Sequence, residues 1–214
     1  LRLSQRLSAV AYALFANSPL LEGKSSGFLS TRGEIWSRTD NDRCGLIEEL
    51  LSPAAGVDDF VTYALDVPLY FIERNQQYVD MTASRVTFRQ FLDSGWNGEG
   101  ATLKDWNLHL STLFPEVRLR PQIEVRSADS LPPRFTPAVA AFYKGLLYSE
   151  EALQGAEALL MSLPRDEFVS LYQRSWRDGF TTRYADGTLG EIIAELLKLA
   201  QTSLQQQFAA AYSG

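Results

Sequence analysis

Three arginines, a glutamine and a glutamate alternate with other residues in one short run, at positions Arg118, Arg120, Gln122, Glu124 and Arg126. If residues 118–126 form one β-strand, all five side chains share a face, because successive side chains of a strand point to opposite sides. The guanidinium groups could bind a phosphate or carboxylate, and Glu124 could give an oxygen ligand to Mg²⁺. Arg126 could then neutralise charge on a transferring phosphoryl group. A solvated outer face with cross-strand Arg–Glu pairs is the structural alternative.

A second candidate site lies in the segment 23–34, where Gly23, Gly27 and Gly33 are spaced among serines and a threonine around Arg32. Small residues allow a close approach of the backbone to an anion, and Arg32 could bind a carboxylate with two parallel hydrogen bonds. The segment does not match the G-x-x-x-x-G-K-[ST] pattern, so a Walker-type nucleotide site is not expected. An ordinary polar loop is the alternative interpretation.

The single histidine and the single cysteine are predicted to be structural. His109 lies at helical spacing from Trp106 and Leu113, which favours a packed or capping histidine over a catalytic one. Cys44 has no His/Asp partner pattern typical of a nucleophile. With one cysteine, the chain cannot form an intrachain disulfide or a multi-cysteine metal site.

The elements that position these residues follow from hydrophobic periodicity and capping signals. Residues 17–43 are expected to be a long loop. Residues 58–73 could form a helix or a strand, and Asp58 as a cap with Asp66-Val67-Pro68 in the middle favours a helix with a kink. Short strands are expected at 78–81 and 118–126, with Pro121 at an edge or bulge. Amphipathic helices are predicted at 2–16, 87–92, 102–113, 137–148, 150–162, 164–176 and 188–208. The predicted fold class is therefore α+β, helix-rich towards the C-terminus.

Composition narrows the classes of partner. The 214 residues suit one domain, and 20 basic against 26 acidic residues give a net charge of −6. This charge disfavours nucleic acid and anionic membranes as partners. The apolar stretches are shorter than the roughly 20 residues that a transmembrane helix needs, and no secretory leader is visible. The cytoplasm is the simplest predicted location, with the plastid as the alternative if a transit peptide precedes Leu1.

Several short phrases of the sequence are informative through the order in which they occur. The phrases are Asn17-Ser18-Pro19, Glu22-Gly23-Lys24, Gly27-Phe28-Leu29-Ser30-Thr31-Arg32, Ile35-Trp36, Asp40-Asn41-Asp42-Arg43, Tyr63-Ala64-Leu65-Asp66-Val67-Pro68-Leu69-Tyr70-Phe71, Tyr78-Val79-Asp80, Thr87-Phe88-Arg89-Gln90-Phe91-Leu92, His109-Leu110-Ser111-Thr112-Leu113-Phe114-Pro115-Glu116-Val117-Arg118 and Ile123-Glu124-Val125-Arg126-Ser127-Ala128-Asp129. Their order resembles that of the plant-type glutamate–cysteine ligases. The resemblance spans most of residues 10–150 and thins beyond that to a helical pattern.

The resemblance implies an ATP-dependent ligase that joins glutamate, through γ-glutamyl phosphate, to the amine of cysteine in the first step of glutathione biosynthesis. It implies that Arg32 binds the glutamate carboxylate, that Tyr70 lies against the cysteine moiety, and that Glu124 ligates Mg²⁺. Arg126 would stabilise the transferring phosphoryl group. The resemblance also implies substrate binding by Asn17, Ser18 and Arg118, and nucleotide binding by Arg126 together with Arg120.

The implied fold is that of glutamine synthetase, a curved antiparallel sheet with flanking helices, of which only the second half is expected here. Residues 1–135 would form the active-site segment and 136–214 a helical segment of a single domain. No Gly-x-Glu-x-Glu-like phrase for further metal ligands occurs in this sequence, so it is expected upstream and the chain alone is expected to be inactive. A homodimer or a missing N-terminal half is the expected partner.

Two alternatives remain open from the sequence. One is a carboxylate–amine ligase that uses an acceptor amine other than cysteine. The other is a non-catalytic homologue that binds glutamate or a nucleotide.

Overall fold

The computed structural model describes residues 1–185 and 187–212, and the chain divides into two compact units. Unit 1 comprises Leu1–Arg2 and Ser37–Glu124, and unit 2 comprises Leu3–Trp36 and Val125–Gly214. Helices and short two-stranded sheets make up both units, so the α+β class is confirmed. No sheet larger than two strands occurs among the described residues, and the glutamine-synthetase-like arrangement stays a prediction.

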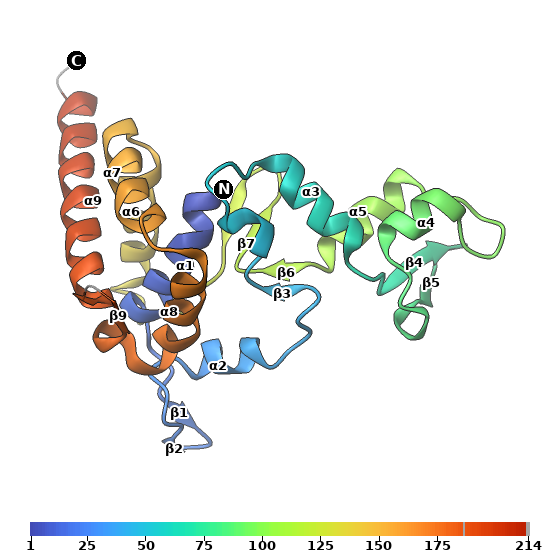
Figure 1. Cartoon of the computed structure of the whole chain (residues 1–214), viewed down its shortest axis with the longest axis horizontal. Helices are drawn as coiled ribbons and strands as arrows, with labels where there is room; N and C mark the ends of the chain where they lie inside the picture. The colour runs from blue at the N-terminus through green and yellow to red at the C-terminus, as the bar shows by residue number, and fades with distance from the viewer. Residues whose placement is uncertain (186, 213–214) are drawn as a thin grey trace. The chain divides into compact units, whose positions relative to one another are not determined.

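Unit 2 is built mainly from helices, which lie side by side in Figure 1. Its five long helices are α1 (Arg2–Leu14), α6 (Thr136–Leu147), α7 (Glu150–Met161), α8 (Arg165–Asp178) and α9 (Leu189–Tyr212). The helix α9 packs against α6 and α7, and the strands β9 (Arg183–Tyr184) and β10 (Gly187–Thr188) precede it. Each of these helices was predicted within a few residues of its ends. None of the described helices has both the length and the apolar character needed to cross a bilayer.

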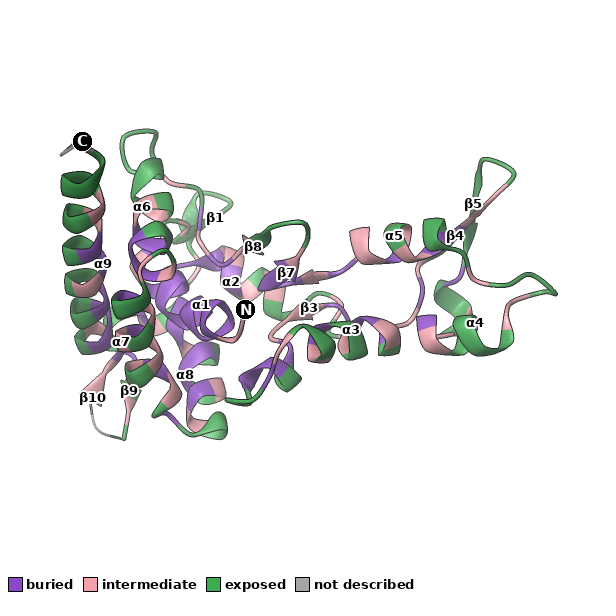
Figure 2. Ribbon diagram, turned by 90° about the horizontal axis from the view of Figure 1, so that it is seen from above, coloured by how far each residue is buried: buried purple, intermediate pink, exposed green. Residues whose placement is uncertain are grey.

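The first helix, predicted as amphipathic, is buried on all sides in the folded chain, its polar side chains included. Every residue from Leu3 to Ala13 is buried, as Figure 2 shows for α1. Its buried Arg6 donates from Nη1 to the carbonyl oxygens of Leu160 and Leu163, each at 2.9 Å. These carbonyls lie at the C-terminal end of α7, where backbone oxygens lack partners within the helix. Arg6 thus joins α1 to the end of α7.

The segment 17–43 is not one long loop, so that prediction was wrong. It contains a hairpin of β1 (Leu20–Leu21) and β2 (Lys24–Ser25), and the helix α2 (Thr31–Ser37). The hairpin turn has Glu22 and Gly23 at positive φ, as expected for a tight turn between antiparallel strands. A seven-residue helix spans two turns, which is too short to show a clear hydrophobic period.

Unit 1 holds the remaining elements. They are β3 (Cys44–Gly45), η1 (Glu48–Leu51), α3 (Val57–Asp66), β4 (Phe71–Arg74), β5 (Gln77–Asp80), η2 (Thr82–Ser84), α4 (Phe88–Ser94), α5 (Leu103–Ser111), β6 (Phe114–Pro115), β7 (Val117–Leu119) and β8 (Ile123–Val125). The strands β4 and β5 pair antiparallel, and β3 runs parallel to β6. Thr87 and Thr102 cap α4 and α5 as capping boxes, so those helix starts follow the sequence signal.

The predicted kink at Pro68 is instead the end of a helix. The helix α3 stops at Asp66, and Val67 is extended with φ −74° and ψ 133°. The residue before a proline is disfavoured in the helical region, which explains why the chain leaves the helix here. It then continues into β4. The helix begins after Gly56, whose N–H donates to Asp59 at 2.7 Å, and not at Asp58 as predicted.

The predicted strand 118–126 is interrupted, so its five polar side chains do not form one face. The strands β7 and β8 pair with each other, and the residues between them form a turn in which the Arg120 N–H donates to the Gln122 carbonyl at 2.9 Å. Pro121 lies in this turn, where its missing N–H costs no ladder hydrogen bond. Arg118 pairs with Glu124 across the two strands. The structural alternative, a cross-strand ion pair, describes this part of the chain.

His109 is packed in the core, as predicted. It is 1% exposed, its Nε2 lies 2.7 Å from the Ala64 carbonyl oxygen, and its ring lies 5.2 Å from that of Phe88. Burial lowers the pKa of His109 to about 4. Nδ1 has no hydrogen-bond partner among the described residues, so a proton there would face no acceptor. Leu103, at the start of α5, is 76% exposed.

We expect Gly145→Ala to destabilise unit 2. A Cβ at Gly145 in α6 would lie 2.6 Å from the Ala200 carbonyl oxygen and 2.8 Å from its Cα in α9. Overpacking of this kind costs about 1–3 kcal/mol, which outweighs the helix propensity gained. Gly155→Ala is the matched control, because its Cβ would meet only the Leu199 side chain, at 3.0 Å or more. Urea unfolding measures the free energy of unfolding of both variants. A Gly145→Ala protein that is more stable than wild type would contradict the close packing of α6 and α9.

We expect the stability of unit 1 to fall in mild acid because of His109. Its pKa is about 4 in the folded state and roughly 6.5 when unfolded, so the stabilisation is complete above pH 6.5 and is lost as the pH falls towards 4. The loss amounts to about 3 kcal/mol. His109→Gln keeps a donor for Ala64 and does not titrate. The difference in unfolding free energy between wild type and this variant, measured from pH 7.5 to 4, should shrink; a constant difference would refute the shift.

Candidate functional site

Arg32 lies in the first turn of α2 in unit 2 and is half-buried. Its guanidinium carbon lies 6.0 Å from the Tyr12 ring centroid and 5.8 Å from that of Trp36. Nη2 donates to the backbone oxygen of Arg126, which fixes the orientation of the group. Nη1 is buried and has no hydrogen-bond partner among the described residues. A buried charged donor without a partner is costly in free energy, so Nη1 is suited to donate a hydrogen bond to an oxygen of a ligand.

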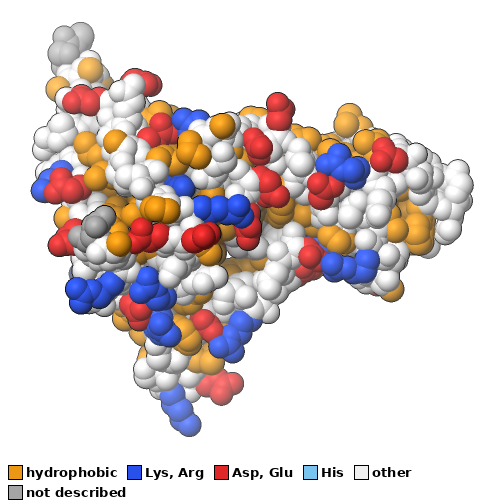
Figure 3. All heavy atoms as spheres, in the orientation of Figure 1, with side chains coloured by type: hydrophobic (Ala, Val, Ile, Leu, Met, Phe, Trp, Pro, Cys, Tyr) orange, Lys and Arg blue, Asp and Glu red, His pale blue; other side chains and the backbone are white. Residues whose placement is uncertain are grey.

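Arg126 lies beside the same aromatic ring. Its guanidinium carbon is 5.8 Å from the Trp36 ring centroid, the same distance as that of Arg32. Two cations on one indole make a local positive site in a chain whose net charge is −6. On the face drawn in Figure 3, acidic and basic side chains are interspersed rather than gathered by sign. The structure thus brings the guanidinium groups of Arg32 and Arg126 to the same indole ring.

Asn17 and Ser18 are close to Arg32, but their polar groups contact the protein. The Asn17 N–H and the Ser18 hydroxyl both donate to Asp129 Oδ2, each at 2.7 Å. The Asn17 side-chain amide donates to the Ser130 carbonyl at 2.8 Å. Ser18 Oγ in turn accepts from the Arg32 N–H at 3.2 Å. These two residues therefore hold the segment that carries Arg32.

Tyr70 belongs to a compact polar group in unit 1. Its hydroxyl donates to Asp40 Oδ2 at 2.6 Å, and Arg43 Nε donates to the same oxygen at 3.0 Å. The Arg43 guanidinium carbon lies 3.3 Å from the Tyr70 ring centroid, and Nη2 donates to the Pro68 carbonyl at 2.7 Å. Burial, with the hydrogen bond to Asp40, raises the pKa of Tyr70. Burial opposes ionisation of Asp40, but hydrogen bonds from Tyr70 and Arg43 prevail and lower its pKa.

Arg118 and Glu124 form an ion pair in unit 1. Arg118 Nη2 lies 3.0 Å from Glu124 Oε1 and 2.8 Å from Oε2, and Nη1 donates to the Leu113 carbonyl at 3.2 Å. Both oxygens of Glu124 therefore accept from Arg118. No group of three or more histidine, cysteine, aspartate or glutamate side chains suited to a metal occurs among the residues described. These residues alone do not fit a magnesium site, since one paired carboxylate offers too few oxygen ligands.

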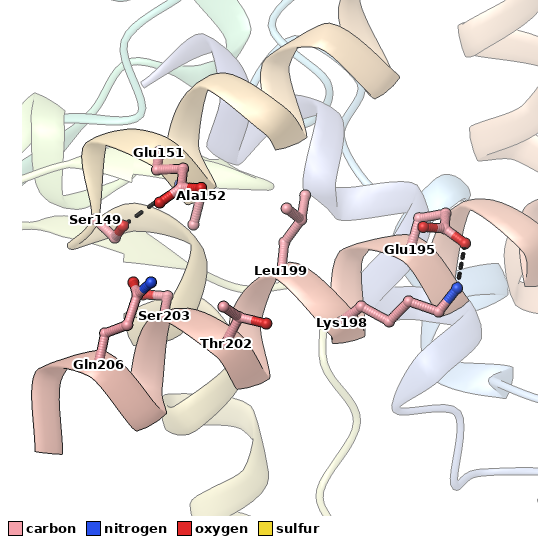
Figure 4. Close-up of a pocket in the computed structure, with 9 residues that line it drawn as sticks. All are labelled: Ser149, Glu151, Ala152, Glu195, Lys198, Leu199, Thr202, Ser203 and Gln206. Carbon is pink, nitrogen blue, oxygen red and sulfur yellow. Dashed lines mark hydrogen bonds and ion pairs between the residues drawn. The ribbon is translucent and has the colours of Figure 1, made fainter. Parts of the chain in front are cut away.

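Neither of two pockets that described residues line within the units contains Arg32 or Arg126. A pocket of about 450 Å³ in unit 1 is lined by Phe60, Val61, Trp106, Asn107, Leu110, Leu119, Arg120 and Pro121. It includes Arg120, which is exposed in the turn between β7 and β8. A pocket of about 280 Å³ in unit 2 lies between α7 and α9, where Figure 4 shows the pair Lys198–Glu195 along its edge. The second pocket contains no predicted site residue.

The predicted residues therefore form separate groups. In unit 2 the structure brings together Asn17, Ser18, Arg32 and Arg126. In unit 1 it pairs Arg118 with Glu124 and surrounds Tyr70 with two residues that the sequence analysis did not single out, Asp40 and Arg43. Asp129 was missed as well. The only signal for these three is their presence in the phrases that resemble the ligase family.

Comparison with known proteins agrees with this resemblance. The family glutamate-cysteine ligase family 2 (GCS2) matches residues 1–212. A chloroplastic glutamate–cysteine ligase of Brassica juncea is 44% identical over 94% of this chain and 39% of its own length. The corresponding enzyme of Arabidopsis thaliana is 42% identical over 94% of the chain and 39% of its length, and ligase A of Oryza sativa subsp. indica is 40% identical over 94% and 41%.

The chain spans about two-fifths of the length of these curated relatives. The family match covers nearly the whole chain, and the phrases that carry Arg32, Tyr70, Glu124 and Arg126 lie within it. This chain therefore belongs to glutamate–cysteine ligase family 2.

Proposed function

We propose that this chain takes part in the ATP-dependent ligation of glutamate to cysteine, which gives γ-glutamylcysteine. Family membership and the printed names of the relatives support this function. In the reaction the glutamate γ-carboxylate takes the γ-phosphoryl group of ATP, and ADP leaves. The cysteine amine then attacks the acyl phosphate, forms the amide and releases phosphate. The single structural observation that carries the proposal is the buried, unpartnered Nη1 of Arg32 beside Arg126.

The proposed role of Arg32 is to bind a carboxylate of glutamate. Nη2 is held by the Arg126 backbone, and the rings of Tyr12 and Trp36 flank the guanidinium, so Nη1 presents its donors in a fixed direction. A preoriented guanidinium loses little entropy when it binds a carboxylate. Arg126 shares the Trp36 ring and would stabilise charge on the transferring phosphoryl group.

The proposed role of Tyr70 is to contact cysteine with its ring edge. Asp40 accepts a hydrogen bond from the Tyr70 hydroxyl, and Arg43 covers one face of the ring, so the side chain has a set orientation. Asp40 and Arg43 are therefore proposed to position Tyr70, without contacting the substrate themselves. Nucleotide binding by Arg120 also belongs to this proposal, supported by its place at an apolar pocket that includes Trp106.

The proposed role of Glu124 is to supply one carboxylate ligand to a Mg²⁺ ion bound with the nucleotide. The described residues do not provide the other ligands, and Arg118 holds Glu124 in place by pairing with both of its oxygens. When bound, Mg²⁺ would neutralise charge on the phosphates of ATP. The proposal also includes a glutamine-synthetase-like fold and a homodimeric state for the enzyme.

We propose the plastid as the location, because the relatives are named as chloroplastic enzymes. The cytoplasmic location expected from composition has no support from these relatives.

We expect Arg32→Ala in the complete enzyme to raise the KM for glutamate about 10- to 100-fold, the value of one or two charged hydrogen bonds. The KM for ATP should stay unchanged. The measurement is ADP release that depends on both glutamate and cysteine, with other amino acids compared as acceptors. Arg183→Ala, which removes an exposed arginine of β9 in the same unit, is the control. An unchanged KM for glutamate would contradict the binding role.

We expect Glu124→Gln to lower kcat at least about 100-fold while the protein stays folded, because glutamine keeps the size but loses the charge that a metal ligand needs. Steady-state ADP release at several Mg²⁺ concentrations measures the effect, and circular dichroism checks the fold. Glu99→Gln is the matched control, because Glu99 also pairs with an arginine, Arg74, but is exposed. Full activity of Glu124→Gln would exclude the metal role.

A further inference from the structure

The carboxylate of Asp129 is the centre of a hydrogen-bond network in unit 2. Asp129 is 6% exposed. Oδ2 accepts from the Asn17 N–H and the Ser18 hydroxyl, and Oδ1 accepts from the Ser30 hydroxyl, all at 2.7 Å. Short hydrogen bonds to an ionised acceptor are the strong ones, and three of them compensate for the burial of this charge. The donors come from positions about a hundred residues away in the sequence.

The network continues from Asp129 to the start of α2. Each serine hydroxyl has one hydrogen, and donation of it to Asp129 leaves the oxygen lone pairs free to accept. Ser18 Oγ accepts from the Arg32 N–H and Ser30 Oγ accepts from the Gly33 N–H, both at 3.2 Å. The first turn of α2 is therefore held by two hydroxyl groups whose orientation is set by Asp129.

Asp129 also lies in the same short segment as the backbone oxygen that holds the Arg32 guanidinium. It follows Arg126 by three residues, and the Arg126 carbonyl accepts from Arg32 Nη2. Arg32 is thus fixed at its backbone through Ser18 and at its guanidinium through the segment that ends in Asp129. A shift of Asp129 would move both attachment points of Arg32.

We propose that Asp129 is a positioning residue for glutamate: it acts through Ser18 and Ser30 on Arg32 and does not touch the substrate. This inference rests on the proposed function, in which Arg32 binds a carboxylate of glutamate. An isolated carboxylate near an anionic substrate would repel it. With three donors on Asp129, its role is to orient hydroxyl groups and not to offer a charge to the ligand.

The test is a double-mutant cycle in the complete enzyme, with Arg32→Ala, Asp129→Asn and the double variant. Asparagine keeps the size of Asp129 but presents an NH₂ group where a donor now points. We expect Asp129→Asn to raise the KM for glutamate about tenfold, with the KM for ATP changed less than about twofold. The KM for glutamate of the double variant should be no higher than that of Arg32→Ala, because Asp129 acts only through Arg32. Asp166→Asn, at an exposed position of α8, is the matched control.

Ser18→Ala keeps the test decisive if Asp129→Asn does not fold. It removes one hydroxyl of the network and should raise the KM for glutamate about threefold in a folded protein. Any of three results would overturn the inference while Arg32 keeps its role. The KM for glutamate could be unchanged in folded Ser18→Ala or Asp129→Asn, or the KM values for all substrates could rise equally. The third such result is an effect of Asp129→Asn that adds to that of Arg32→Ala. If Arg32→Ala itself leaves the KM for glutamate unchanged, the proposed function fails at Arg32 and the inference fails with it.

Discussion

A buried carboxylate must be satisfied by hydrogen bonds, and in unit 2 the donors for Asp129 come from Asn17, Ser18 and Ser30. The arrangement of the candidate site depends on this requirement. It brings the hairpin segment, the start of α2 and the segment after Arg126 together, and it sets the direction in which Arg32 presents its guanidinium. Any change that leaves the carboxylate without donors costs free energy, so the three segments are held together by the same charge.

The chain uses buried arginines in two ways. Arg6, Arg43 and Arg118 donate to backbone carbonyl oxygens that helices and loops leave without partners. These arginines stabilise the fold, since each satisfies groups that would otherwise be buried unpaired. Arg32 differs, because its terminal nitrogen Nη1 is buried and has no acceptor among the described residues.

The chain belongs to a ligase family and spans only part of the length of its relatives, and the proposed roles of its residues follow from both facts. The chain spans about two-fifths of the length of its curated relatives and contains Arg32 and Arg126 at one indole ring, the oriented Tyr70 and the ion-paired Glu124. It contains no cluster of metal-binding side chains among the residues described. The proposed division of work follows: this segment orients substrates and neutralises charge, while most metal ligands come from outside it.

The sequence by itself determined the features that depend on neighbours in the chain. Helical periodicity predicted α1 and α6 to α9, and the starts of α4 and α5 were predicted within one residue of where they lie. The ordered phrases around Arg32 and Glu124 identified the family, which comparison confirmed. These signals are local, so they do not require knowledge of which segments meet in space.

The tertiary structure alone decided the rest. The alternation at 118–126 predicted one strand, but the chain turns at Pro121, and Arg118 and Glu124 neutralise each other there. The short α2 had too few residues for a period to appear, and α1 is buried on all sides because other helices surround it. Asp129 acts through hydrogen bonds that span about a hundred residues. Such long-range contacts produce no periodic pattern in the sequence. They are determined by how the segments pack and by the free-energy cost of burying an unpaired charge.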